Sequence, residues 1–141
     1  MSSSASMPSP SFRLHSVTVL VDDYDVAIAH FVDDLGFHLI EDTNLGDGKR
    51  WVRVAPDPGG EPALLLAVAS TDEQRAAIGR QAGGRVGFFL HTDDFVAYHA
   101  RLVARGVRMT EEPRVEPYGT VVVFEDRYGN RWDLIQPAGV R

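Results

Sequence analysis

Residues 16–37 read SVTVLVDDYDVAIAHFVDDLGF, and residues 87–107 read GFFLHTDDFVAYHARLVARGV. Each stretch begins with a short apolar run, continues through two aspartates and an aromatic residue, and ends with a glycine followed by an apolar residue. A pattern repeated in this way within one chain is typical of an internal duplication. The two stretches therefore predict two copies of one strand–helix unit.

The spacing of apolar residues predicts the secondary structure of each unit. Residues 16–21 alternate as a half-buried strand does, and residues 24–35 carry apolar side chains at the helical period. Asp23 and Asp94 can cap the two helices, because a carboxylate accepts hydrogen bonds from the free N–H groups of a first turn. Three further strands are predicted after each helix, at residues 37–42, 50–55 and 63–69 and at residues 107–112, 119–125 and 131–136. Each unit is therefore βαβββ.

These elements divide the chain into four segments. Residues 1–11, rich in Ser and Pro, are expected to be a disordered tail, and residues 12–69 form the first unit. Residues 70–84 are a linker in which Ser70 and Glu73 form a capping box for a short helix ending near residue 81. Residues 85–138 form the second unit. The two units together are expected to make one α+β domain.

Composition excludes several classes of partner. The formal net charge is −6 and there is no basic run, which argues against nucleic acid. No apolar stretch is long enough to span a membrane as a helix. The absence of cysteine excludes disulfides and thiolate catalysis, and it fits a cytoplasmic location.

The C-terminal segment points to a family. Residues 124–134, FEDRYGNRWDL, resemble the F-x-D-P-x-G-N-x-x-E-L signature of the vicinal-oxygen-chelate superfamily, the glyoxalase/bleomycin-resistance/dioxygenase proteins. The resemblance implies that the strands curl into an open cup, with helices outside and a small-molecule ligand inside. It also implies a homodimer. It does not choose between isomerases, dioxygenases, transferases and non-catalytic drug binders.

Strand alternation predicts which side chains face that cup. If the valines of residues 16–21 and 50–55 meet the helices, Trp51 and Arg53 face inward. By the same rule Phe89 and His91 of the fifth strand, and Arg131 and Asp133 of the last strand, also face inward. One β-bulge would invert such an assignment.

The resemblance also raises the question of a metal. Metal-dependent members carry His at the start of the first and fifth strands and Glu on last strands, but the corresponding residues here are Ser16, Gly87 and Asp133. We therefore expect no metal cofactor. The alternative is a divalent ion held by His15, His91 and Asp133 if a bulge turns His15 inward.

The remaining candidates are ligand-binding or catalytic groups. Arg53 or Arg131 could bind a carboxylate or phosphate, or could form an internal ion pair with Asp133. Trp51 and Phe89 could stack on a planar ligand or simply pack in the core, and Tyr118 could donate to a ligand oxygen. The leading expectation is a protein that binds a small polar or aromatic molecule without metal.

Two enzymatic alternatives stay open. One is a metal-dependent enzyme of glyoxalase or extradiol-dioxygenase type. The other is a metal-free isomerase or lyase that uses His91 or Asp133 as acid or base. The other histidines, His30, His38 and His99, are expected on solvated surfaces.

Overall fold

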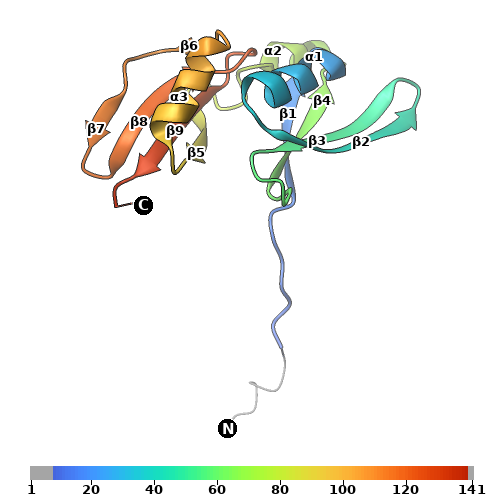
Figure 1. Ribbon diagram of the computed structural model, residues 1–141. Helices are drawn as coiled ribbons and strands as arrows, with labels where there is room; N and C mark the ends of the chain where they lie inside the picture. Colours follow the sequence, from blue (N-terminus) through green and yellow to red (C-terminus); the bar gives the residue numbers. More distant parts are fainter. Residues whose placement is uncertain (1–7, 140–141) are drawn as a thin grey trace.

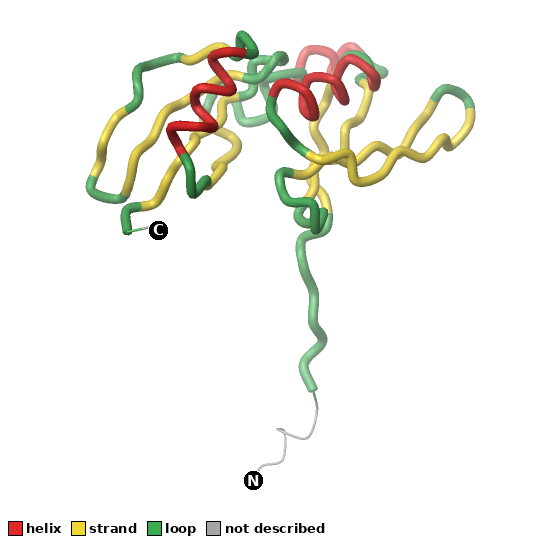
Figure 2. The backbone as a smooth tube through the Cα atoms, in the orientation of Figure 1, coloured by secondary structure: helices red, strands yellow, loops and turns green. Residues whose placement is uncertain are grey.

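The computed structural model describes residues 8–139. The tail expected over residues 1–11 therefore lies mostly outside the described residues. Two βαβββ units sit side by side, and the described N-terminal segment extends away from both (Figures 1 and 2). The fold is α+β, as the alternation of the sequence predicts.

The first unit forms a four-stranded sheet. Its elements are β1 (Ser16–Val21), α1 (Tyr24–Ala29), the π-helical turn η2 (His30–Asp34), β2 (His38–Gly46), β3 (Lys49–Ala55) and β4 (Ala63–Val68). The strand order is β1-β4-β3-β2, and β1 runs parallel to β4. Asp23 caps α1 as expected, since its Oδ2 accepts from Val26 N at 2.8 Å.

The second unit repeats this order with a broken second strand. Its elements are β5 (Val86–His91), α3 (Phe95–Ala104), β6 (Arg108–Met109), β7 (Arg114–Glu116), β8 (Gly119–Glu125) and β9 (Arg131–Pro137). Asp94 caps α3 by accepting from Ala97 N at 3.1 Å. The single strand expected at residues 107–112 is wrong. Only β6 forms there, and pairing with β8 resumes at β7, after Pro113, which has no N–H to donate to a ladder.

The linker differs from its expected form. The helix α2 (Asp72–Ala77) is capped by Thr71, whose side chain accepts from Gln74 N at 3.0 Å, so the Ser70–Glu73 capping box is wrong by one residue. The helix also ends before residue 81. Gln81 instead bonds to the free edge of β1, accepting from Leu20 N at 2.8 Å and donating to Thr18 O at 3.0 Å.

One hydrophobic core joins the two units. Trp132 of β9 lies at its centre, with ring centroids 4.3 Å from Phe88, 5.6 Å from Phe37 and 6.5 Å from Phe31. Of the valines of β1 and β3 that alternation assigns to the interior, four are buried: Val19, Val21, Val52 and Val54. Val17, near the start of β1, was expected there too but is 42% exposed. Burial of one face of each sheet against α1 or α3 leaves the opposite face of each sheet for function.

Candidate functional site

The expected site residues lie on two separate surfaces. The first open face is the side of β1–β4 opposite the buried valines, and it carries Ser16, Glu41, Trp51, Arg53 and Ala67. The second open face is the corresponding side of β5–β9, and it carries Phe89, His91, Arg114, Arg131 and Asp133. Among the hydrogen bonds and ion pairs of residues 8–139, none joins the two sets. The structure therefore places the site residues expected from the sequence on two separate faces.

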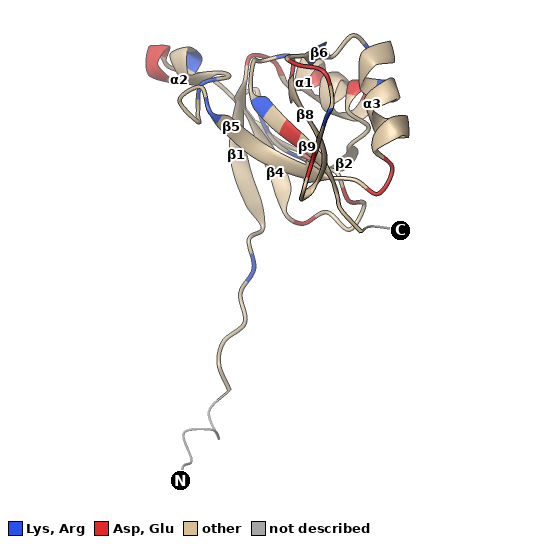
Figure 3. Ribbon diagram, turned by 90° about the vertical axis from the view of Figure 1, so that its left-hand side faces the viewer, with Lys and Arg blue, Asp and Glu red and all other residues tan. Residues whose placement is uncertain are grey.

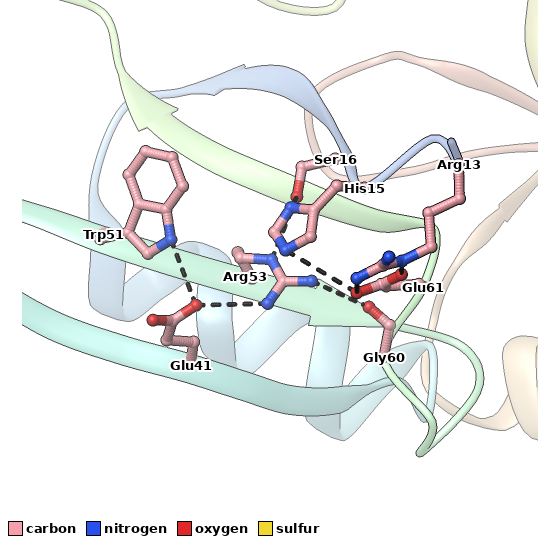
Figure 4. A network of polar contacts seen from close by, with 8 residues as sticks. All are labelled: Arg13, His15, Ser16, Glu41, Trp51, Arg53, Gly60 and Glu61. Atoms are coloured by element: carbon pink, nitrogen blue, oxygen red, sulfur yellow. Dashed lines mark hydrogen bonds and ion pairs between the residues drawn. The ribbon is translucent and has the colours of Figure 1, made fainter. Parts of the chain in front are cut away.

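Arg53 is the centre of the first open face (Figure 4). Its side chain is only 7% exposed, and all three guanidinium nitrogens donate within the chain. Nε donates to Ser16 Oγ at 3.0 Å, Nη1 to Glu41 Oε1 at 3.2 Å and Nη2 to the Gly60 carbonyl at 3.0 Å. Arg53 thus ties β1, β2 and the loop before β4 together.

Glu41 is a site residue that the sequence reasoning missed. It lies directly opposite Arg53 in the β2–β3 register, and its Oε1 also accepts from Trp51 Nε1 at 3.2 Å. The other carboxylate oxygen, Oε2, accepts no hydrogen bond from residues 8–139. Pairing the predicted strands at residues 37–42 and 50–55 would have suggested Glu41 as a candidate site residue. Its exact partner, however, depends on a β-bulge between Leu39 and Glu41, which sets the register of the two strands.

His15 belongs to the margin of this network. Its Nδ1 lies 2.8 Å from Ser16 Oγ, and its Nε2 lies 3.8 Å from Glu61, which also pairs with Arg13 (Figure 4). Residues 8–139 contain no group of three or more His, Asp or Glu side chains placed to hold a metal ion. His15, His91 and Asp133 are therefore not brought together within the described part of one chain.

A cavity of about 640 Å³ opens beside the first open face. Trp51, Leu65 and Ala67 contribute its apolar wall. Arg50 lines the opposite side, where it pairs with Asp25 at 2.9 Å and Asp42 at 2.7 Å and lies 5.1 Å above the Tyr24 ring. The cavity is large enough for a small organic molecule.

The second open face holds an unpartnered carboxylate oxygen. Asp133 Oδ1 is buried and has no hydrogen-bond partner among the described residues. Burial raises the pKa of Asp133, and Glu111 adds to this rise, while Arg114 opposes it. Arg114 itself is held between Glu111 at 3.0 Å and Glu116 at 2.6 Å. Figure 3, which faces this unit, shows acidic and basic positions close together along its strands.

The ion pair considered between Arg131 and Asp133 does not form. Arg131 pairs instead with Glu125, its cross-strand neighbour on β8, at 3.4 Å. Phe89 lies opposite Asp133 and is 66% exposed, and Tyr118 is also exposed. His91 is exposed too, and its imidazole makes no hydrogen bond with residues 8–139.

His30 corrects a prediction of another kind. It was expected on a solvated surface, but its side chain is buried. Its Nδ1 lies 2.9 Å from Asp34 Oδ2, and its Nε2 accepts from Arg127 N at 3.0 Å. His30 thereby links the first unit to the turn before β9. Its partner is 97 residues away, so no local pattern could have indicated the contact.

A family model matches this architecture over most of the chain. The Glyoxalase/Bleomycin resistance protein/Dioxygenase superfamily model covers residues 13–134. The chain belongs to this superfamily. An uncharacterized protein of Shewanella frigidimarina (strain NCIMB 400) is 50% identical over 121 residues, which are 85% of this chain and 90% of the relative.

Solved structures of other proteins agree with the fold. The crystal structure of UcmS2 is similar at a TM-score of 0.76 and 31% identity, covering 89% of this chain and 98% of that one. The structure of TnmS3, an antibiotic binding protein from Streptomyces sp. CB03234, is similar at a TM-score of 0.67 and 30% identity, covering 94% and 100%. No helix within residues 8–139 is long and apolar enough to cross a membrane.

Proposed function

We propose that this superfamily member binds a small planar organic molecule on the first open face, without a metal ion. The observation that carries the proposal is the exposure of aromatic residues on both open faces, with Trp51 37% and Phe89 66% exposed. Aromatic side chains left on a sheet face beside fixed polar groups are typical of a ligand site. The likeness to TnmS3, an antibiotic binding protein, supports the same class of function.

The proposal includes a second copy of the chain. The second open face and its margin expose the aromatic side chains of Phe89 and Tyr118, which a second copy of the chain would cover. In a homodimer, this surface of one copy would lie opposite the first open face of the other and complete the cup. Each cup would then hold Trp51 from one copy and Phe89 from its partner.

A screen of planar aromatic compounds by thermal shift tests the binding proposal. A compound at a hundred times its dissociation constant stabilises the folded protein by about 2.7 kcal/mol. We expect Trp51→Ala and Phe89→Ala each to weaken binding about three- to tenfold, because an aromatic contact contributes roughly 0.5–1.5 kcal/mol. The proposal fails if no compound stabilises the protein, or if neither substitution weakens binding.

Complementation tests the shared cup. A heterodimer of the Trp51→Ala and Phe89→Ala variants would contain one cup with both aromatic residues intact. Mixing the two variants, after brief denaturation and refolding together, should restore binding to part of the sites. Sedimentation should show a dimer that Phe89→Asp weakens and Val26→Asp, on the exposed side of α1, does not. A monomer at micromolar concentration, or no restoration on mixing, contradicts the shared cup.

Metal-free acid–base chemistry is a second candidate, favoured by the unpartnered Oδ1 of Asp133. A carboxyl group in this position could exchange a proton with a bound ligand. Compounds found in the screen can be incubated with the protein in D2O and followed by NMR. Exchange of a carbon-bound hydrogen that Asp133→Asn abolishes, with binding retained, would support this chemistry. Exchange unaffected by the substitution would exclude Asp133.

A further inference from the structure

We propose that the first open face selects a planar ligand that carries a positive charge, and that Glu41 is the residue that selects it. This inference rests on the proposed function and adds the chemical class of the ligand. It reverses the expectation from sequence, in which an arginine of the cup binds an anion. Three observations carry it: the engagement of Arg53, the free oxygen of Glu41, and the excess of carboxylates around the cavity.

Arg53 has few means of binding an anion. Each of its three nitrogens already donates to Ser16 Oγ, Glu41 Oε1 or the Gly60 carbonyl. Three of its five N–H groups are used in this way, and the side chain is only 7% exposed, which limits the approach of an incoming carboxylate to the other two. Its charge is moreover compensated by Glu41, 3.2 Å away. Arg53 is therefore a positioning residue, which fixes Glu41 against β3.

Glu41 presents the unused polar atom of the network. Its Oε1 is held by two donors, Trp51 Nε1 and Arg53 Nη1, both at 3.2 Å. Its Oε2 has no partner within residues 8–139, and the carboxylate side chain is 42% exposed. Two donors on one oxygen fix the direction of the carboxylate, so little conformational entropy is lost when a ligand binds to the other oxygen.

Trp51 places an aromatic ring beside that oxygen. The hydrogen bond to Glu41 uses the indole N–H, at the ring edge, which leaves a ring face available to a ligand (Figure 4). Its register neighbour on β2 is the short Thr43, and the small Ala67 lines the same cavity, so a flat molecule can approach. A ligand cation beside an indole face and a carboxylate is attracted by both.

The charges around the cavity favour the same sign. Asp22, Asp23 and Asp47 line it, against Lys49 and Arg50. Arg50 is already paired with two further carboxylates, those of Asp25 and Asp42. Carboxylates therefore exceed basic groups around this cavity, which contains Trp51 but not Glu41 in its wall, and this excess attracts cations and repels anions.

Three probes that share one ring system test the inference: naphthalene-2-carboxamidine, 2-naphthamide and 2-naphthoate, with charges of +1, 0 and −1. Binding to the purified full chain is measured by calorimetry at low and high salt. We expect the amidine to bind at least tenfold more tightly than the naphthoate. Salt should reduce the difference, because it screens charge.

Glu41→Gln is the decisive variant, because glutamine keeps an oxygen that can accept from Trp51 and Arg53 while removing the charge. We expect it to weaken amidine binding about tenfold and to change naphthamide binding less than twofold. Glu112→Gln, which removes an equal charge from an exposed position between β6 and β7, should change neither. Circular dichroism checks that each variant folds.

The outcomes separate this inference from the proposed function. If all three probes bind equally and Trp51→Ala weakens them, the aromatic site stands and the charge selection is wrong. Tighter binding of the naphthoate, or an amidine affinity unchanged by Glu41→Gln, also overturns the inference. If none of the probes binds at millimolar concentration, the inference is wrong, and the broader compound screen decides the proposed function.

Discussion

An aspartate stands in the turn between the third and fourth strands of each unit, and the two aspartates have opposite environments. Asp57 is exposed, and its Oδ1 accepts from Gly59 N at 2.8 Å. Asp126 is 5% exposed and accepts from four donors: Tyr128 N at 2.9 Å, Asn130 N at 3.1 Å, Asn130 Nδ2 at 3.0 Å and Trp132 Nε1 at 3.0 Å. The second turn is built as an interior element, and the first is a surface loop.

The position of the second turn explains the difference. Residues 126–130 lie against the first unit and the linker, since Arg127 N donates to His30 and the Tyr128 carbonyl meets Gly79. A turn in that place cannot leave its backbone groups to water, so it needs an internal acceptor. The FEDRYGN segment that identifies the family is therefore the junction between the two units.

The open faces differ in a similar way. In the first unit, Arg53 and Glu41 pair across two long strands, β2 and β3. In the second unit, Arg114 pairs with Glu111 and Glu116, which are three and two residues away along the chain. The two units thus share the order of elements and not the polar site, because the core constrains only the buried face of each sheet.

The comparison of the two turns predicts its largest effect for Asp126→Ala. This change leaves buried N–H groups of Asn130 and Trp132 without an acceptor, at a cost of about 3–5 kcal/mol in the free energy of unfolding. Asp57→Ala should cost under about 1 kcal/mol, because water can replace the carboxylate. Chemical denaturation of both variants measures the difference. Equal losses would mean that the second turn is not a structural junction.

Two glycines of the linker give the next comparison. Both have positive φ, but a Cβ on Gly79 would lie 1.9 Å from Tyr128 O, whereas a Cβ on Gly83 would have no atom within 4 Å. Gly83→Ala should cost about 1–2 kcal/mol from left-handed strain alone. Gly79→Ala should cost clearly more, because the linker must also move away from the second turn. Thermal and chemical unfolding of the pair tests this, and similar losses would contradict the close approach.

Asp34 connects the two units electrostatically, and its substitution is expected to have the smallest effect on the free energy of unfolding. Burial would raise its pKa, but hydrogen bonds from His30 and from Arg105 of the second unit outweigh it and lower the pKa below the usual range. Because the pKa of Asp34 is lower in the folded state, its carboxylate stabilises the fold fully at pH values above the unfolded-state pKa, about 3.9. This stabilisation is lost as the pH falls through the folded-state pKa.

Asp34→Asn should therefore reduce stability at pH 7 by about 1 kcal/mol, with the difference from wild type shrinking below about pH 4. Asp33→Asn is the matched control, since the Asp33 side chain makes no hydrogen bond or ion pair with residues 8–139. Unfolding curves between pH 2.5 and pH 7 measure both variants. A loss at Asp34 that does not depend on pH would indicate a packing effect instead.

Sequence reasoning succeeded where the relevant physics is local. Alternation assigned Val52 and Val54 to the core and Arg53 to the opposite face, because successive side chains of a strand point to opposite sides. The caps Asp23 and Asp94 were likewise identified from their places beside apolar helical patterns. It failed for Glu41, whose partner depends on a β-bulge, and for the strand interrupted before Pro113.

The amino-acid sequence by itself determined the duplicated βαβββ units, the buried side of each sheet and the superfamily, because these follow from periodicity and from one contiguous motif. The tertiary structure decided which polar groups are free. Whether Arg53 can bind an anion depends on Ser16, Glu41 and Gly60, which reach it from three other segments of the chain. The burial of His30 depends on Arg127 in the same way. Hydrogen-bond occupancy is set by contacts between distant segments, and local patterns do not contain it.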